Sequence, residues 1–471
     1  MPNTFPLITR EPEDAIAFLT QPVTQIGLAA GIISARQFIR HVKHVSEALP
    51  PYQHAINLCE NRYLFLVGFC AAILRGITTL LPPNHNPATQ EQLDQEYGGC
   101  FIIHDGIDIS AQLPAFNLLS VTTDSAGDGT NDRDETVPAI QDELLACISF
   151  TSGSTGKSKP NLKYWRTLHR SSFINYRFMI PDGDETLYQL ATMPAQHMWG
   201  LETSALLPLF SKVCMSDAKP LFPQDIIDTF AALPSPRQLV STPVHLRALC
   251  AGMSAPLAAH SVLCATSPLT IELAQEAEQK FMAPLREVYG CSEVGSMAVR
   301  RTTQEKAWQK FEGIHFTQQG DTTLASAEHL PETIALQDFI TFHAPHRFVL
   351  SGRASDLVKI AGKRGSLFDI NQTLLTFEGL EDGMVILPAA STRVTRLVAI
   401  VALKPGIEKA ALMKFLQANL DSAFVPRPVY VVDALPREPN GKLLRKNIDA
   451  LHASLKKKRD KQVSKNDTER G

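Results

Sequence analysis

The sequence predicts an α/β fold with a large N-terminal domain, in which layered βαβ sheets are covered by helices, and a small α+β C-terminal domain. The chain has 471 residues, which is too many for one compact core. Residues Ala55–Cys59 and Ile77–Leu81 read as strands around a helix that Asn61 caps and that runs to Leu74. Such a unit indicates a parallel sheet covered by helices. After Arg353 the predicted elements become shorter, as in a small α+β domain.

Composition and charge exclude several classes of protein. Hydrophobic residues make up 44% of the chain and charged residues 20%, as in ordinary globular proteins. There are 45 Lys and Arg against 48 Asp and Glu, which gives a net charge of -3. Nucleic-acid binders usually carry a strong basic excess, so we expect no nucleic acid as a partner.

Cysteine spacing and the N-terminal sequence predict a cytoplasmic protein. No two cysteines form a CxxC pair, and buried reduced thiols are the expectation for all eight. The N-terminus lacks the basic and apolar segments of a secretory signal. The longest apolar run, Tyr63–Leu74, is shorter than the ~20 residues that span a bilayer, so no membrane span is expected.

Turn-rich stretches and changes in composition along the chain predict three segments. Residues 1–354 form the large domain, in which Thr122–Pro138 is an exposed loop and Leu144–Phe150 is a strand. Residues 355–450 form the small domain, with strands expected within 357–362, 384–388, 396–403 and 429–435 and a helix near Lys409–Leu420. Residues 451–471 are expected to be a charged, disordered tail.

The segment Thr151–Pro160, TSGSTGKSKP, follows a predicted strand and indicates a phosphate-binding loop. Its glycines and small residues allow backbone N–H groups to converge on an anion, and its hydroxyls and lysines add charged hydrogen bonds. It is not a Walker loop, because the glycine required five positions before Gly156 is Thr151. Pro160 also favours an extended conformation at Lys159, whereas a Walker loop passes directly into a helix.

This loop resembles the first signature of the adenylate-forming superfamily, which contains acyl- and aryl-CoA synthetases, peptide-synthetase adenylation domains and luciferases. The matching residues, which the resemblance assigns to ATP binding, are Thr151, Ser152, Gly153, Ser154, Thr155, Gly156 and Lys159. Ser158 and Pro160 depart from the family pattern, and they predict a stiffer exit from the loop.

A second segment, Tyr289–Glu293, is similar to the family's Tyr-Gly-x-Thr-Glu motif. The resemblance implies that Tyr289 and Gly290 contact the adenine side of the nucleotide and that Ser292 lies near the α-phosphate. It further implies that Glu293 holds Mg²⁺, a hard cation that prefers oxygen ligands and needs few from the protein.

A third segment, Ser351–Arg364, resembles the family's hinge motif. Arg353 would bind the ribose together with Asp338, although Gln337 replaces the glycine that usually precedes that aspartate. Ser355 occupies the hinge position, and the resemblance therefore implies a mobile C-terminal domain. Lys359 and Gly362 would face the acyl-adenylate during transfer to a thiol.

The last motif, PREPNGKLLRK at Pro436–Lys446, is close to the family's C-terminal lysine segment. By resemblance, Lys442 is the catalytic lysine that reaches the reacting carboxylate. The four motifs occur in the family order over roughly residues 55–446. Only residues 447–471 follow, so we expect the acceptor thiol to come from a separate molecule.

The substrate pocket is implied by two further segments. Met193–Glu202, MPAQHMWGLE, resembles the Pro-x-x-His-x-x-Gly segment of acyl- and aryl-CoA ligases, in which His197 and Trp199 would line the acyl site. Cys264–Leu269, CATSPL, resembles the family's Gly-Ala-x-Pro-Leu turn, and the resemblance implies that Thr266 and Ser267 line the adenine and acyl sites. Amino-acid-activating domains generally have an aspartate in this neighbourhood, and none lies between Ala191 and Leu209.

The resemblance therefore implies an ATP- and Mg²⁺-dependent acid–thiol ligase. It would activate a fatty or aromatic acid as acyl-AMP, release pyrophosphate, and transfer the acyl group to CoA or to the phosphopantetheine of a separate acyl carrier protein. The alternatives are an enzyme that adenylates an amino acid, a luciferase-like oxidase, and a regulator that binds acyl-adenylate without turning over.

Overall fold

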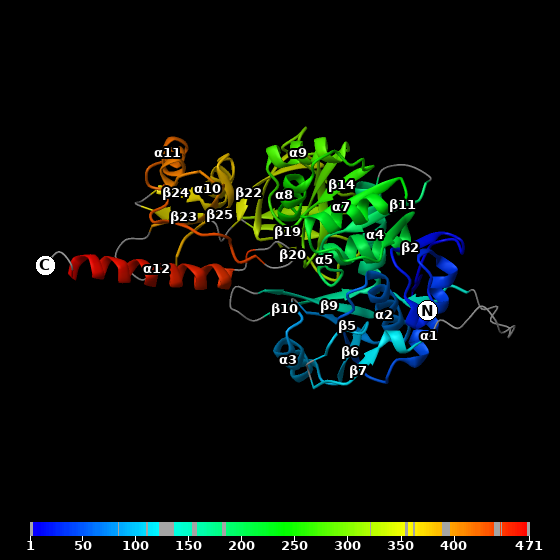
Figure 1. Ribbon diagram of the computed structural model, residues 1–471. Coiled ribbons are helices and arrows are strands. Elements are labelled where there is room, and N and C mark those ends of the chain that lie inside the picture. The colour runs from blue at the N-terminus through cyan, green and yellow to red at the C-terminus, as the bar shows by residue number, and fades with distance from the viewer. Residues whose placement is uncertain are drawn as a thin grey trace. The chain divides into compact units, whose positions relative to one another are not determined.

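A computed structural model describes the chain except for residues 1–2, 83, 110–111, 122–135, 153–157, 181–184, 321, 354–356, 361–362, 389–395, 438–442, 444 and 469–471. The chain forms two compact units. Unit 1 comprises Met1–Ile314 and Ser326–Thr333, and unit 2 comprises His315–Ala325 and Ile334–Gly471. Unit 1 runs from blue to green in Figure 1, and most of unit 2 is yellow to red. The mixed α/β architecture, with a larger N-terminal and a smaller C-terminal part, is the predicted one.

The first sheet of unit 1 has the order β10-β9-β5-β4-β6-β7. Its strands are β4 His54–Asn57, β5 Thr78–Leu81, β6 Cys100–His104, β7 Ala115–Asn117, β9 Leu145–Ser152 and β10 Ser158–Tyr164. All neighbouring pairs are parallel except β9 and β10, which are antiparallel. The predicted strand–helix–strand unit is therefore confirmed.

Helix α2, Arg62–Leu74, connects β4 to β5 and is buried almost all round. The Asn61 side chain accepts a hydrogen bond from the Leu64 amide at 3.1 Å, as the predicted cap requires. A helix that is apolar on every face must be covered on every face. Side chains of α1 (Ala35–Ala48) and α2 accordingly belong to one apolar cluster.

The second sheet of unit 1 contains strands in the order β17-β16-β15-β14-β13-β11-β12-β2-β3. Their bounds are β2 Ala15–Leu19, β3 Gly31–Ser34, β11 Leu187–Ala191, β12 Val213–Ser216, β13 Arg237–Ser241, β14 Ser261–Cys264, β15 Leu285–Cys291, β16 Gly295–Arg300 and β17 Trp308–Lys310. The strands from β2 to β15 in this order pair in parallel, whereas β3, β16 and β17 pair antiparallel with their neighbours.

Helices cover this second sheet. Helices α7 (Pro223–Ala232), α8 (Pro243–Gly252) and α9 (Ile271–Phe281) share one apolar cluster with β11, β13, β14 and β15. The other helices of unit 1 are η1 Thr24–Ile26, α3 Pro87–Tyr97, η2 Leu118–Ser120, α4 Trp165–Met179, α5 Met198–Gly200, η3 Leu201–Leu206 and α6 Leu207–Phe210. A short antiparallel pair, β1 Thr4–Pro6 with β8 Ala139–Gln141, completes unit 1.

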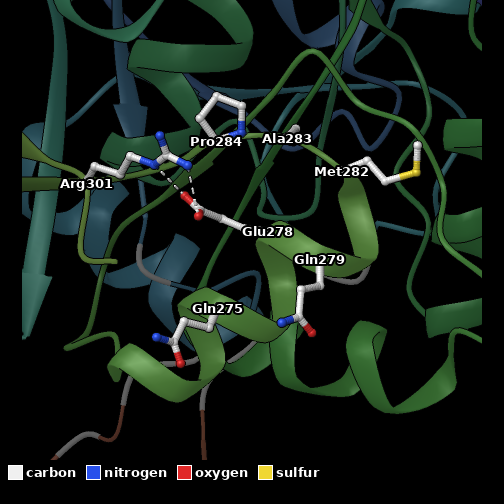
Figure 2. A pocket seen from close by; sticks show the side chains of 7 residues that line it. All are labelled: Gln275, Glu278, Gln279, Met282, Ala283, Pro284 and Arg301. Carbon is white, nitrogen blue, oxygen red and sulfur yellow. Dashed lines mark hydrogen bonds and ion pairs between the residues drawn. The ribbon is translucent and has the colours of Figure 1, made fainter. Parts of the chain in front are cut away.

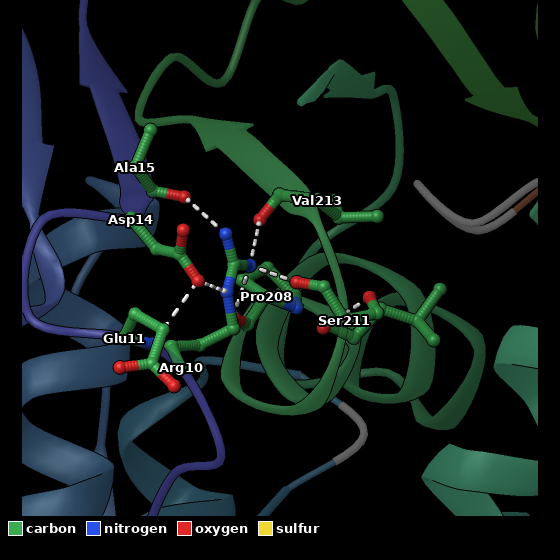
Figure 3. Close-up of polar contacts among 8 residues, drawn as sticks. Arg10, Glu11, Asp14, Ala15, Pro208, Ser211 and Val213 are labelled. Carbon is green, nitrogen blue, oxygen red and sulfur yellow. Dashed lines mark hydrogen bonds and ion pairs between the residues drawn. The ribbon is translucent and has the colours of Figure 1, made fainter. Parts of the chain in front are cut away.

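Arg10 ties the N-terminal segment to the second sheet (Figure 3). Its guanidinium is buried and donates to the carbonyl oxygens of Ala15 and Val213 at 3.1 and 3.2 Å. It also donates to the carbonyl oxygens of Pro208 and Ser211 and to the carboxylate of Asp14. Five donors in a planar fork suit such a set of acceptors, which a lysine could not satisfy.

Unit 2 contains short strands and three helices among its described residues. The strands are β18 His315–Gln319, β19 Thr322–Ser326, β20 Ile334–Ala335, β21 Asp338–Ala344, β22 Arg347–Arg353, β23 Leu357–Ile360, β24 Lys363–Ser366, β25 Leu380–Ile386, β26 Val398–Leu403 and β27 Val429–Val431. The helices are α10 Leu367–Leu375, α11 Lys409–Asn419 and α12 Arg445–Thr468. The strands and the helix predicted after Arg353 are all present.

The expectation of a disordered tail at residues 451–471 differs from the structure, in which α12 continues to Thr468. Leu451 and Leu455 pack against the apolar cluster around β25 and β26, and this contact anchors the first turns of the helix. In the part of the chain that is described, no helix has both the length and the apolar character needed to cross a membrane.

Replacing Arg10 by Met should lower the free energy of unfolding by about 3 kcal/mol, because several buried carbonyl groups lose a charged donor. Urea denaturation of the variant would measure this loss. Arg36→Met removes the exposed ion pair with Glu13 and serves as the control, with an expected loss below about 1 kcal/mol. Equal midpoints for both variants would contradict the role given to Arg10.

Candidate active site

The carboxyl ends of parallel strands bring three of the predicted unit 1 segments, those of His197, Thr266 and Tyr289–Glu293, to one edge of the second sheet. Strands β11, β13, β14 and β15 are neighbours in that order. His197 follows β11, Thr266 follows β14, and Tyr289 and Gly290 come directly before Cys291, the last residue of β15. Ligands of open α/β sheets bind in the crevice outside the carboxyl ends of the strands. The topology thus gathers residues that lie almost a hundred positions apart in the sequence.

The Tyr289–Glu293 segment forms a tight hairpin between β15 and β16. Cys291 pairs with Gly295, so Ser292, Glu293 and Val294 make the turn. Gly295 has a φ of 96°, which favours glycine over other residues. Glu293 lies at the tip of the turn and is half-buried. The turn therefore presents one carboxylate from a compact and well-supported loop.

Two buried charged side chains hold this turn. The ammonium of Lys163 on β10 donates to the main-chain oxygen of Glu293 at 2.8 Å. Glu202 in η3 accepts hydrogen bonds from the Ser296 amide at 3.1 Å and the Ser296 hydroxyl at 2.8 Å. Asn175 also donates to Glu202, at 3.3 Å. The turn is thus held at its tip by a cation and at its end by an anion.

Burial and charge act in opposite directions on these two groups. Burial lowers the pKa of Lys163, and the negative charge of Glu202 counteracts that effect. Burial raises the pKa of Glu202, against the hydrogen bonds from Ser296 and Asn175 and the charge of Lys163. Each buried group therefore supports the charged form of the other.

A second set of contacts supports Tyr289. Its ring lies 5.7 Å from the Trp308 ring, and the Arg300 guanidinium lies 4.4 Å from the centre of Trp308. Arg300 also pairs with the buried carboxylate of Glu287 at 2.7 Å. Glu287 in turn accepts a hydrogen bond from the Leu269 amide at 3.1 Å, so one carboxylate joins β15 to the turn after β14.

The segment that carries His197 is anchored by its main chain. The buried guanidinium of Arg62 donates to the carbonyl oxygens of Ala191 and Met193 at 2.7 and 2.5 Å. Gln196 donates to the Cys59 carbonyl at 2.9 Å. His197 is half-buried, and its Nδ1 accepts a hydrogen bond from the Trp199 amide at 3.3 Å. In the neutral ring this leaves the proton on Nε2.

Two predicted pocket residues have constrained surroundings. Trp199 is 5% exposed and its indole N–H donates to the Ser241 carbonyl at 3.3 Å. Thr266 has a φ of 88°, which is uncommon for a β-branched residue. Its hydroxyl oxygen is buried, and no described group forms a hydrogen bond with it. Ser267, beside it, is half-buried. Strained backbone of this kind is concentrated at ligand sites.

The two described ends of the glycine-rich segment lie on β9 and β10, paired antiparallel in the first sheet. Ser152 pairs with Ser158, and Thr151 pairs with the exposed Lys159. The segment leads into strand β10 and not into a helix, as Pro160 predicts. Gly153, Ser154, Thr155 and Gly156 lie outside the described residues.

Unit 2 carries the other predicted residues. Asp338 at the start of β21 and Arg353 at the end of β22 are partners across an antiparallel pair, so the structure brings these two together. Lys359 is on β23, opposite Arg364. Ser355, Gly362 and Lys442 lie outside the described residues.

The donor set at the turn is compatible with magnesium. Among the described residues there is no group of three or more His, Cys, Asp or Glu that could enclose a metal ion. Magnesium keeps several waters and usually takes one or two protein carboxylates together with substrate phosphates. A single carboxylate at the tip of a turn, as at Glu293, fits that pattern.

A hollow of about 620 Å³ elsewhere in unit 1 is separate from this edge (Figure 2). It is lined by the end of α9 and by Ala283, Pro284 and Arg301, and Arg301 pairs with Glu278 at 2.8 Å. Pro284 precedes β15, whereas Glu293 follows that strand, which is about 20 Å long at about 3.3 Å per residue. The hollow therefore lies at the amino end of the sheet, away from the gathered motifs.

Four supporting residues escaped the sequence analysis: Lys163, Glu202, Glu287 and Trp308. Glu202 leaves a signal, because it is the one acidic residue in the run from Met198 to Phe210. Lys163 leaves none, because β10 turns Lys163 inward and leaves Leu162 47% exposed, against the usual pattern.

Comparison with known proteins identifies the class of this chain. The model of the AMP-binding enzyme family matches residues 50–317, and the model of the AMP-binding enzyme C-terminal domain matches residues 369–442. The first match alone spans more than half of the chain. The chain therefore belongs to the AMP-binding enzyme family, and the predicted resemblance is confirmed.

Individual relatives agree with this assignment. The chain is 26% identical over 310 residues to 4-coumarate–CoA ligase of Rhodobacter capsulatus, which covers 64% of this chain and 76% of that protein. It is 19% identical over 319 residues to 3,4-dihydroxybenzoate–[aryl-carrier protein] ligase of Bacillus anthracis, covering 65% and 74%. The ATP-bound structure of MatB from Rhodopseudomonas palustris shares the fold, with a TM-score of 0.76 at 16% identity over 94% of this chain and 96% of MatB.

Replacing Gly200 by Ala should distort the segment that holds His197, because the added Cβ would lie 2.0 Å from the Pro194 oxygen. Overpacking of this kind costs about 1–3 kcal/mol, so we expect a lower thermal unfolding temperature. Gly252→Ala is the matched control, since its Cβ would meet only Pro223 at 3.6 Å. Unchanged unfolding of the Gly200 variant would show that the segment has room to move.

Proposed function

We propose that this chain is an ATP-dependent acid–thiol ligase that activates a carboxylic acid as acyl-AMP and transfers the acyl group to CoA or to a carrier-protein phosphopantetheine. The observation that carries the proposal is that the Tyr289–Glu293 motif shares one sheet edge with the segments of His197 and Thr266, and that Lys163 and Glu202 hold the turn that bears Glu293. The family match supports the class of reaction, whereas the acid and the acceptor are our own inference.

ATP is proposed to bind along the motif residues. Tyr289 and Gly290 would contact adenine, and Ser292 would contact the α-phosphate. Asp338 and Arg353, which pair across β21 and β22, would bind the ribose hydroxyls. The Thr151–Lys159 loop would hold the departing pyrophosphate through its N–H groups and the Lys159 ammonium.

The first half-reaction joins two anions, so its barrier is largely electrostatic. An oxygen of the carboxylate attacks the α-phosphorus, a new P–O bond forms, and pyrophosphate leaves. The ammonium of Lys442 would offset charge on the carboxylate and the α-phosphate. Magnesium held by Glu293 would supply charge neutralisation at the phosphate oxygens. Removing one preorganised charged donor of this type typically slows the reaction about 100–1000-fold.

The second half-reaction requires a thiol at the acyl carbon. The sulfur forms a bond to that carbon, the bond to AMP breaks, and the thiol proton is released. A rotation about Ser355 would withdraw Lys442 and bring Lys359 and Gly362 toward the acyl-adenylate, as hinge motions do in lidded enzymes. His197 and Trp199 would border the path of the thiol.

An aromatic or fatty acid is proposed as the substrate in preference to an amino acid. The carboxylate of the Met193–Glu202 segment is that of Glu202. It already accepts three hydrogen bonds, two from Ser296 and one from Asn175. It is therefore poorly placed to pair with a substrate ammonium. The two relatives described above are named for 4-coumarate and 3,4-dihydroxybenzoate, which supports testing aromatic acids first.

Two thiols are proposed as the acyl acceptor, that of CoA and that of a carrier-protein phosphopantetheine. One relative is named for CoA and the other for an aryl-carrier protein. Both acceptors present the same phosphopantetheine arm, so the chemistry at the acyl carbon is identical. Thr266 and Ser267 would line the acyl and adenine sites in either case.

A pyrophosphate-exchange screen over fatty, benzoic, cinnamic and α-amino acids tests the proposal. We expect exchange with one class of fatty or aromatic acid, followed by acyl transfer to CoA or to a phosphopantetheinylated carrier. Strict dependence on an α-amino acid would overturn the substrate class. Nucleotide binding without exchange for any acid would favour a regulator that does not turn over.

Lys442→Ala should slow acyl-AMP formation about 100–1000-fold, so that it is all but abolished, yet spare transfer from supplied acyl-AMP to the thiol. The two half-reactions, assayed separately, give this comparison. Lys446→Ala, which changes an exposed lysine on α12, is the control and should leave both rates unchanged. An equal loss in both half-reactions would refute a role confined to adenylation.

A further inference from the structure

Lys163 is a buried cation that no family motif contains. Its side chain is 1% exposed, and its ammonium donates to the main-chain oxygen of Glu293 at 2.8 Å. Removing an ammonium from water costs free energy that an apolar side chain in the same space would avoid. The cost is compensated only where the charge makes a contact that an apolar residue cannot make, and here that contact is the peptide at the tip of the turn.

Glu202 holds the other end of the same turn. It is 2% exposed, and its two oxygens accept from the amide and the hydroxyl of Ser296. A Cβ on Gly295 would lie 2.5 Å from the same carboxylate, so the turn is packed directly against Glu202. The carboxylate can therefore fix the direction in which the chain leaves the turn.

The two charges belong to different parts of unit 1. Lys163 is on β10 of the first sheet, whereas Glu202 is in η3, and they meet the turn between β15 and β16 from these separate elements. The negative charge of Glu202 raises the pKa of Lys163, whereas the burial of Lys163 lowers it. A turn held by charge-assisted bonds from two rigid elements has little freedom to tilt.

We propose that Lys163 and Glu202 are positioning residues that fix the position and direction of the Glu293 carboxylate for binding Mg²⁺ with ATP. This inference rests on the proposed function, because it takes Glu293 as the magnesium ligand. Lys163 acts through the peptide of Glu293 and touches neither substrate nor metal. Outer contacts of this kind typically change metal affinity about 10–100-fold when they are removed.

The test compares Lys163→Met with Lys280→Met in the full-length protein. Lys280 is the matched control, because its ammonium also donates to a main-chain oxygen, that of Met253 at 2.6 Å, but far from the turn. Calorimetric titration of Mg²⁺ into protein with ATP gives the half-saturating concentration. We expect a rise of about tenfold for Lys163→Met and no change for Lys280→Met.

A double-mutant cycle separates positioning from general damage. In the Glu293→Gln background, Lys163→Met should cause no further change in the magnesium titration, because its effect passes through Glu293. A fully additive effect would overturn the proposal. An unchanged titration for folded Lys163→Met in the wild-type background would also overturn it.

A second variant and a second measurement guard against misfolding and against failure of the proposed function. Lys163→Met/Glu202→Gln removes both charges, so it avoids leaving one buried charge alone. Hydrogen exchange at residues 292–296 should be faster in this variant than in Lys280→Met, whether or not ATP binds. Absence of magnesium-dependent ATP binding in the wild type would reject the proposed function, whereas unchanged exchange at the turn would reject the positioning role.

Discussion

Parallel pairing of β11, β13, β14 and β15 is the constraint on which the site depends. Because these strands run in the same direction, their carboxyl ends and the loops that follow them share one edge of the sheet. Pairing of the strands in the sheet is the one long-range contact needed to place these loops on the same edge. The helices between the strands then fill one apolar layer, and the loops remain free to carry polar groups.

Buried charge gives this edge its rigidity. Arg62, Lys163, Glu202 and Glu287 all lie beneath or beside the loops. Each makes a hydrogen bond to a main-chain group of a loop or of the strand end next to it. A buried ion without such partners would be strongly destabilising, so each loop must keep the conformation that satisfies its ion. The loops are therefore preorganised by the groups beneath them, which is the condition for electrostatic catalysis.

The family motifs and the strand–helix–strand unit could be recognised from the sequence, because they depend on local patterns. Asn61 as a cap, the extended exit at Lys159 and the short elements after Arg353 follow from neighbouring residues alone. Lys163 could not be predicted, since its inward direction is set by the register of β10 on β9. The helix over residues 451–468 was missed because its anchor, the contact of Leu451 and Leu455 with β25 and β26, is tertiary.

The division between motif residues and supporting residues explains how a fold persists at low identity. This chain and MatB share the fold at 16% identity, so most of their aligned residues differ. A group that touches a substrate is restricted by the chemistry of that substrate, whereas a group that only holds a loop can be replaced by any combination that satisfies the same main-chain atoms. Lys163 and Glu202 are one such combination. Supporting pairs of this kind are therefore expected to distinguish members of the family more than the motifs do.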